Sequence, residues 1–109
     1  MIIKDSSVEI EDLGDGISRK ILASGGKMMT TKIFIKKGAV GAVHSHPHEQ
    51  SSYILKGSFE YNFDGEKHIV REGDTIYLPP DTKHGVVALE DSIILDVFTP
   101  QREEFLSGK

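Results

Sequence analysis

Residues 38–57 read GAVGAVHSHPHEQSSYILKG, a stretch that places two histidines and a glutamine at a fixed spacing between two glycines. His44 and His46 are two residues apart, so on an extended strand their side chains point to the same side. Gln50 lies just past a short turn at Pro47. The stretch therefore predicts a strand and turn that present several metal-binding side chains together.

A second stretch, residues 73–84, reads GDTIYLPPDTKH and supplies a third histidine, His84, beyond a hairpin. A rolled-up sheet would bring His84 next to His44, His46 and Gln50. Three neutral imidazoles and one amide oxygen suit a divalent transition metal. We therefore expect one bound metal ion, and nickel, zinc, iron(II) and manganese(II) all suit this ligand set.

Short β-prone segments separated by turn residues fill most of the chain. Its 11 glycines and 4 prolines punctuate these segments as in a sandwich or barrel. The clearest hairpin turn is Asp64-Gly65, because aromatic and polar residues alternate before it and glycine accepts a positive φ. The expected strands are Val8–Leu13, Ser18–Leu22, Met28–Ile35, Gly41–Ser45, Ser52–Lys56, Ser58–Phe63, Lys67–Val70, Thr75–Leu78, Gly85–Leu89 and Ser92–Phe98.

Only the end of the chain has a helical pattern. Pro100–Leu106 predicts about two turns, with Thr99 as the N-cap and Pro100 as the first helical residue. No linker, solenoid repeat or low-complexity segment divides the sequence. The predicted fold class is all-β: a single domain over residues 1–109, folded as a jelly-roll barrel with a short C-terminal helix.

The composition argues against several classes of protein. A net charge of -4 disfavours nucleic acid or an anionic membrane as the main partner. The chain has no cysteine, so disulfides and thiolate metal sites are excluded. No apolar run approaches the ~20 residues of a membrane span, and the first residues do not form a signal peptide. We expect a cytoplasmic protein.

The two histidine-containing stretches resemble the two signatures of the cupin family, and with the strand order the resemblance covers about residues 30 to 100. Three positions differ from the commonest cupin pattern. The usual glutamate is Gln50, the glycine that often follows the proline pair is Asp81, and the asparagine often found after the last histidine is Ala88. The histidines are intact, so the resemblance implies a cupin barrel with a bound metal.

The glutamine and the ending DVFTPQREEFL, residues 96–106, look most like the KdgF-type pectin-degradation proteins. Lys4-Asp5, Glu11–Gly14 and Lys37–Gly41 add to this likeness. Members of that family convert 4,5-unsaturated uronate monosaccharides into the linear 5-keto-4-deoxyuronate form. The resemblance therefore implies a metal-dependent, non-redox enzyme that opens and isomerises a small anionic sugar. Several unsaturated uronates remain as candidate substrates.

Asp96 interrupts the apolar face that Ile94 and Phe98 form on the last strand. A carboxylate in such a place is costly unless it is paired or functional. One interpretation is a structural pair with an arginine or a backbone amide. The other is a catalytic acid/base group that reaches into the barrel near the metal, and the family resemblance favours this one.

Arg102 is the candidate for holding the substrate carboxylate, since a guanidinium binds a carboxylate with two parallel hydrogen bonds. Its alternative is a solvated charge on a helix. Phe98 is a candidate apolar wall for the sugar, and otherwise a core residue. Tyr53 or Tyr61 could offer a hydroxyl to the substrate, and the sequence does not choose between them.

The remaining histidines are expected to lie outside the site. His48 is out of register between His46 and Gln50, so we expect it in a solvent-facing loop. His68 lies beside Glu66 and Lys67 on a hairpin strand and is expected to be exposed.

The neutral side chain of Gln50 affects the expected chemistry of the metal site. Glutamate at that position would lower the formal charge of the site by one. A more positive site is a better Lewis acid and a better anchor for an anion. Two alternatives stay open: an iron-dependent dioxygenase that uses the same histidines, and a non-catalytic metal- or small-molecule-binding protein. We also expect a homodimer, with Val8–Leu13 and Ser18–Leu22 as candidate interface strands.

Overall fold

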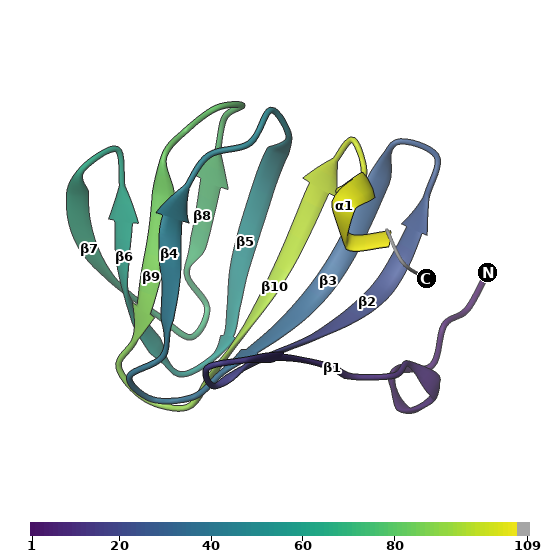
Figure 1. The fold of residues 1–109 in the computed structure, drawn as a ribbon, viewed down its shortest axis with the longest axis horizontal. Coiled ribbons are helices and arrows are strands. Elements are labelled where there is room, and N and C mark those ends of the chain that lie inside the picture. Colours follow the sequence, from purple (N-terminus) through teal and green to yellow (C-terminus); the bar gives the residue numbers. More distant parts are fainter. Residues whose placement is uncertain (107–109) are drawn as a thin grey trace.

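The computed structural model describes residues 1–106, which fold into two antiparallel sheets that curve around a common interior (Figure 1). The larger sheet has the order β1-β2-β3-β10-β5-β8 and the smaller one β4-β9-β6-β7. The strands are β1 (Glu11–Gly14), β2 (Ile17–Gly25), β3 (Met28–Ile35), β4 (Val40–His44), β5 (Glu49–Lys56), β6 (Ser58–Phe63), β7 (Glu66–Arg71), β8 (Thr75–Leu78), β9 (His84–Ala88) and β10 (Ser92–Thr99). A 3-10 turn, η1 (Asp5–Ser7), precedes them, and a short helix, α1 (Glu103–Leu106), follows.

The all-β jelly-roll prediction is confirmed. Each expected strand is present, and β3, β6 and β8 have the predicted bounds. The hairpin turn between β6 and β7 has positive φ at both central residues, Asp64 at 49° and Gly65 at 82°. Both values fit the two-residue turn that the sequence predicted.

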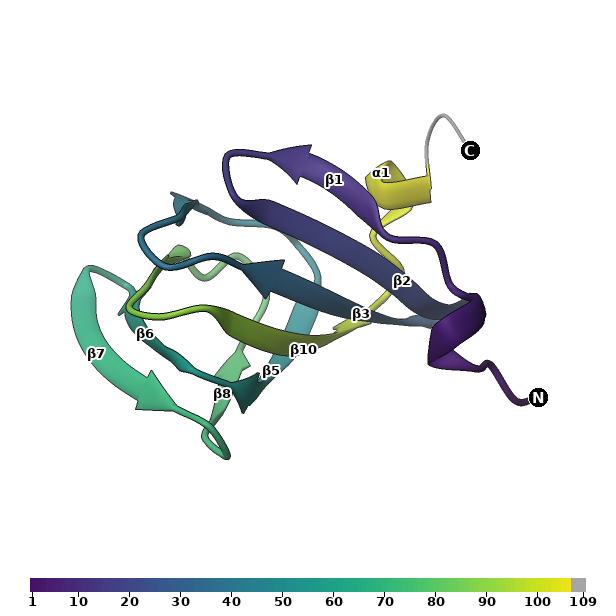
Figure 2. The same ribbon diagram turned by 90° about the horizontal axis from the view of Figure 1, so that it is seen from below.

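The inward faces of the strands carry both apolar and polar residues. A buried cluster of Ile35, Ile54, Phe59, Ala88 and Ile94 joins the two sheets. On β5 the buried polar residues, Gln50 and Ser52, come before the apolar Ile54, whereas on β10 the buried Asp96 lies between Ile94 and Phe98. The hydrophobic core therefore lies around Ile54, Phe59 and Ile94, and the buried polar side chains of β5 and β10 leave room beside it for a polar site. Figure 2 shows the two sheets curving around this interior.

The predicted helix start is wrong. Thr99 is the last residue of β10, where it pairs with Glu49 of β5, so it is not an N-cap. The chain continues through Gln101, whose carbonyl and side chain both hydrogen-bond to other segments, and turns into α1 only at Glu103. The strand ladder thus overrides the local helical signal of Pro100. Within residues 1–106 no helix is long and apolar enough to span a bilayer.

Candidate metal centre

Two antiparallel strands and one loop bring the three histidines together. His44 is the last residue of β4 and His84 the first of β9, and the two are direct partners in the sheet. Their ring centroids lie 4.5 Å apart. His46 is in the loop after β4, with its ring 5.0 Å from that of His84. One nitrogen from each ring lies within 4.8 Å of the others, so the three could hold one metal ion.

Backbone carbonyls set the tautomer of each ring. The Nδ1 atoms of His44, His46 and His84 lie 2.9, 3.1 and 2.9 Å from the carbonyl oxygens of Ala42, His48 and Thr82. A carbonyl oxygen only accepts, so each Nδ1 donates, and a neutral ring then has a free lone pair on Nε2. This outer set of hydrogen bonds is typical of metal-binding histidines.

Gln50 is the second residue of β5 rather than a turn residue, and its amide has a defined orientation. Its Nε2 donates to Asp96 Oδ1 at 3.1 Å and to Ser52 Oγ at 2.9 Å. Oε1 therefore faces His46, 2.9 Å from the Nε2 that carries the ring's lone pair. Two acceptors at contact distance repel each other unless a cation binds both. The donor set thus fits a divalent metal held by His44, His46, Gln50 and His84.

Burial favours the neutral form of two of these histidines, His84 and His46. It lowers the pKa of His84 to about 4. Burial also lowers the pKa of His46, and the charge of Arg102 acts in the same direction. A metal competes with protons for the same nitrogen atoms, so a lowered pKa favours metal binding.

Asp96 faces inward from β10, between Ile94 and Phe98, as the sequence pattern predicted. Its Oδ1 accepts hydrogen bonds from Gln50 Nε2 and, at 2.5 Å, from Ser52 Oγ. Burial raises the pKa of this carboxyl to about 6, against the opposite effect of those two hydrogen bonds. Asp96 is therefore a buried acid at the wall of the cavity, joined to the histidine cluster through one amide.

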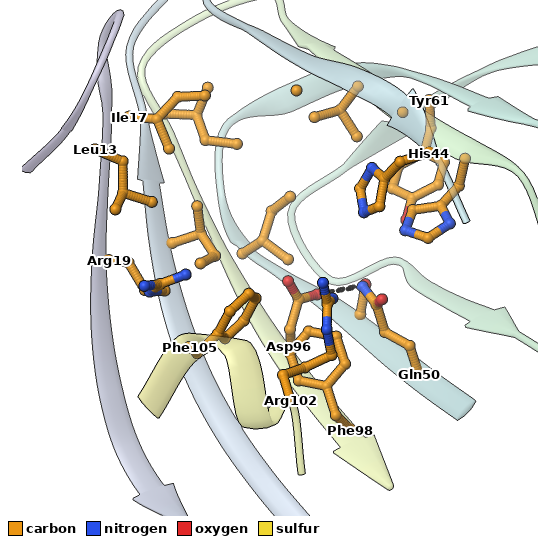
Figure 3. Close-up of a pocket in the computed structure, with 18 residues that line it drawn as sticks. Leu13, Ile17, Arg19, His44, Gln50, Tyr61, Asp96, Phe98, Arg102 and Phe105 are labelled. Atoms are coloured by element: carbon orange, nitrogen blue, oxygen red, sulfur yellow. Dashed lines mark hydrogen bonds between the residues drawn. The ribbon is translucent and has the colours of Figure 1, made fainter. Parts of the chain in front are cut away.

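The interior beside the histidines is a cavity of about 190 Å³ that Asp96, Phe98 and Arg102 line together (Figure 3). Arg102 precedes α1, and its side chain is only 11% exposed. It contacts the rings of Phe98 and Phe105 and is paired with Glu104. The alternative of a solvated Arg102 does not agree with this burial. Phe98 is both a buried residue and a wall of the cavity.

The structure corrects the prediction that Tyr53 could contact the substrate. Tyr53 is 42% exposed on the outer face of β5, because Ser52 and Ile54 take the inward positions. Tyr61 of β6 lines the cavity instead, and burial, followed by the charge of Asp96, raises the pKa of its hydroxyl. Of the two tyrosines, only Tyr61 is placed to contact a ligand in the cavity.

The prediction that His48 faces the solvent is also wrong, because its side chain is buried. Its Nε2 donates to the carbonyl of Gln101 at 3.0 Å, so it ties the histidine loop to the segment before α1. This contact joins residues 53 positions apart, and no local pattern predicts it. His68 is exposed beside Glu66, as expected.

Three further residues at the cavity were not predicted. Ser52 could have been found, because it shares the inward face of β5 with Gln50. Arg19 of β2 and Phe105 of α1 line the cavity on the side away from the histidines. No local sequence pattern marks either residue as part of the site, so only the fold reveals their position.

Comparison with known proteins gives consistent results. Residues 32–98 match the model of the Cupin domain family. The chain is 41% identical to the Pectin degradation protein KdgF of Dickeya dadantii over 94% of each chain. It superposes on the structure of KdgF from Halomonas sp. with a TM-score of 0.92 and 36% identity, over 96% of this chain and 97% of that one. An RmlC-like cupin from Shewanella frigidimarina gives a TM-score of 0.91 and 40% identity, over 94% and 92%.

Proposed function

The chain belongs to the cupin family, in the group of its KdgF-type relatives, and from this we propose that it converts 4,5-unsaturated uronate monosaccharides into linear 5-keto-4-deoxyuronates. The proposed reaction is metal-dependent and non-redox, and it places the protein in pectin degradation. One observation carries the proposal. The amide of Gln50 contacts both His46 and Asp96, so a candidate acid/base group lies beside the candidate metal ligands on one cavity wall.

The reaction needs one proton removed and one added. The hydroxyl at C1 loses its proton, the bond from C1 to the ring oxygen breaks, and an enolate remains at C5. A proton added at C4 then gives the ketone. Substrate and product are isomers, so no oxidant or reductant is required. Asp96 faces the cavity and is the side chain that we assign to these proton transfers.

A small anionic sugar suits the other side chains of the cavity. Arg102 would bind the substrate carboxylate with its guanidinium, a geometry that lysine does not reproduce. Phe98 would pack against the sugar ring, and Tyr61 replaces Tyr53 as the candidate hydroxyl contact. A divalent cation held by the three histidines and Gln50 would supply Lewis acidity and a positive anchor for the anion.

The test is NMR of freshly made 4,5-unsaturated galacturonate with metal-loaded protein, with metal-stripped protein and with buffer alone. The conversion also proceeds without a catalyst, so only a rate above that of the buffer counts. We expect faster formation of the linear form with the metal-loaded protein alone. No acceleration with nickel, zinc, iron(II) or manganese(II) would contradict the proposed function.

The Asp96→Asn variant tests the assigned proton transfers. An amide keeps the shape of the side chain but cannot exchange the proton, so we expect the rate to fall by about 100-fold or more, in line with the loss of a general acid/base. Metal content must be measured in the same sample. A full rate with metal still bound would exclude Asp96 as the acid/base group.

A further inference from the structure

The position of Arg102 in the cavity is not explained by its own segment. Arg102 comes just before α1, which has only four residues, and so short a helix is not stable by itself. The backbone N–H of Phe105 donates to the carbonyl of Arg102 at 2.9 Å. The Arg102 guanidinium carbon lies 4.4 Å from the centroid of the Phe105 ring. The place of Arg102 therefore depends on the place of Phe105.

Arg19 supplies a rigid partner for that ring from the barrel wall. It lies within β2, where it pairs with Ile33 of β3 and with Glu11 of β1. Its side chain is 11% exposed, and its Nη2 lies 3.4 Å from Glu11 Oε2. Its guanidinium carbon is 4.0 Å from the Phe105 ring centroid. Figure 3 shows the Phe105 ring between the two guanidinium groups.

We propose that Arg19 is a positioning residue that fixes Arg102 through Phe105, by a stack of guanidinium, ring and guanidinium. The inference rests on the proposed function for the role of Arg102 as the carboxylate contact. Cation–π contacts are strong where water is excluded, as it is around Arg19. Gln101 and Phe98 hold the start of this segment, and the stack adds a contact from β2 beyond Arg102, at Phe105. The stack therefore helps to set the position of the Arg102 guanidinium in the cavity.

The stack also predicts that binding of an anionic ligand at Arg102 and formation of the stack are energetically coupled. Two like charges on one ring repel each other, and an anion bound by Arg102 reduces that repulsion. Ligand binding and the stack therefore stabilise each other. The competing explanation is that Arg19 only pairs with Glu11 and stabilises β1 against β2.

Limited trypsin digestion tests the stack without any sugar. Cleavage after Arg102 requires the segment to leave the barrel, and it releases a peptide that begins at Glu103. We expect Arg19→Met to raise the cleavage rate at Arg102 roughly tenfold, the effect of losing one desolvated cation–π contact. Glu11→Gln, which removes the ion pair with Arg19, and Arg71→Met on exposed β7 are the controls. Equal cleavage of Arg19→Met and wild type would overturn the proposal.

Kinetics on 4,5-unsaturated galacturonate test the functional consequence. We expect Arg19→Met to raise KM roughly tenfold, with a smaller effect on kcat and unchanged metal affinity. Arg19→Lys should recover part of the loss, because an ammonium group also binds a ring face. In an Arg102→Met background, Arg19→Met should cause no further increase in KM.

Additive losses in the double variant would show that Arg19 acts by itself and would overturn the positioning role. If wild type does not convert the uronate at all, the proposed function fails. The trypsin result then still establishes or overturns the stack, so the two failures are distinguishable.

Discussion

Gln50 is the residue on which the candidate site depends most, because a single amide makes contacts on two sides. Its oxygen faces His46, and its nitrogen donates to Asp96 and Ser52. A glutamate at this position could accept at the metal but could not donate to Asp96. The amide thus keeps the metal site more positive and at the same time satisfies a buried carboxyl.

We predict that the Gln50→Glu variant binds the metal more tightly and has a lower kcat/KM than wild type. The added carboxylate would face Asp96, and two carboxylates at that distance retain a proton between them. It would also lower the attraction of the site for an anionic substrate. We expect kcat/KM to fall by about 10- to 100-fold, the range typical of altered metal surroundings. Asn62→Asp, the same chemical change outside the cavity, is the control. A variant as active as wild type would contradict the charge argument.

The buried histidines predict how the stability of the metal-free protein depends on pH. Because the pKa of His84 is lowered to about 4 and that of His46 is also lowered, the unfolded chain binds more protons than the folded one below the ordinary histidine pKa. Stability from these groups is therefore complete above about pH 6.5 and falls as the pH drops toward 4. Asp96, whose pKa is raised to about 6, acts in the opposite direction.

Urea unfolding of chelator-treated protein at pH 7, 6 and 5 measures this dependence. We expect the free energy of unfolding to fall with acidification, more gradually for His84→Gln and more steeply for Asp96→Asn. His68→Gln, at an exposed position on β7, should behave like wild type. A His84→Gln variant with the wild-type slope would show that His84 is not the group responsible.

At the level of elements, the sequence predicted the strands well because their signals are local. Alternation on β6 and the Asp64-Gly65 turn depend on neighbouring residues only, and the structure has both. The inward position of Asp96 was also predictable from alternation on β10. The four candidate metal ligands could be grouped because glycines and strand spacing relate them.

Positions that depend on the packing of distant segments were not predictable. His48 contacts Gln101, and Arg19 of β2 meets Phe105 of α1 at the cavity. The choice of Tyr61 over Tyr53 depends on which face of β5 packs against the interior, and Ser52 and Ile54 occupy that face. The start of α1 is delayed because β10 keeps its ladder to Thr99. In each case a tertiary contact determines the outcome.

The connection between β5 and β6 gives a prediction at the element scale. Gly57 has a φ of +85°, and a Cβ added there would lie 2.0 Å from Ser92 Oγ and 2.6 Å from Ser92 Cβ. Ser92 is buried, so it has little room to move. We expect Gly57→Ala to lower the free energy of unfolding by about 3 kcal/mol, from backbone strain and overpacking together.

Gly65→Ala is the matched control for this glycine. Its φ is +82°, but an added Cβ would meet nothing within 4 Å. In Gly65→Ala, backbone strain alone should lower the free energy of unfolding by about 1 kcal/mol. Urea unfolding of both variants separates the two effects, and equal losses would show that contact with Ser92 is not the cause.

At the scale of the whole molecule, the expected homodimer can be related to the edges of the larger sheet. Both β2 edges are paired, with β1 and β3, so β2 cannot offer a free edge as the sequence interpretation allowed. β1 is an edge strand. Ile10, just before it, and Leu13, within it, are 55% and 47% exposed. An unprotected edge with apolar side chains favours association.

We therefore propose a homodimer that forms through β1 and expect light scattering to give about twice the 12.0 kDa of one chain. Ile10→Lys places a charge on this edge and should yield the monomer. Ile10 does not line the cavity, whereas Leu13 does, so only the first can be changed without altering the site. All four candidate metal ligands belong to one chain, so the monomeric variant should keep its metal affinity. A wild-type mass of one chain would exclude the dimer, and loss of metal from the monomer would show that the second chain supports the site.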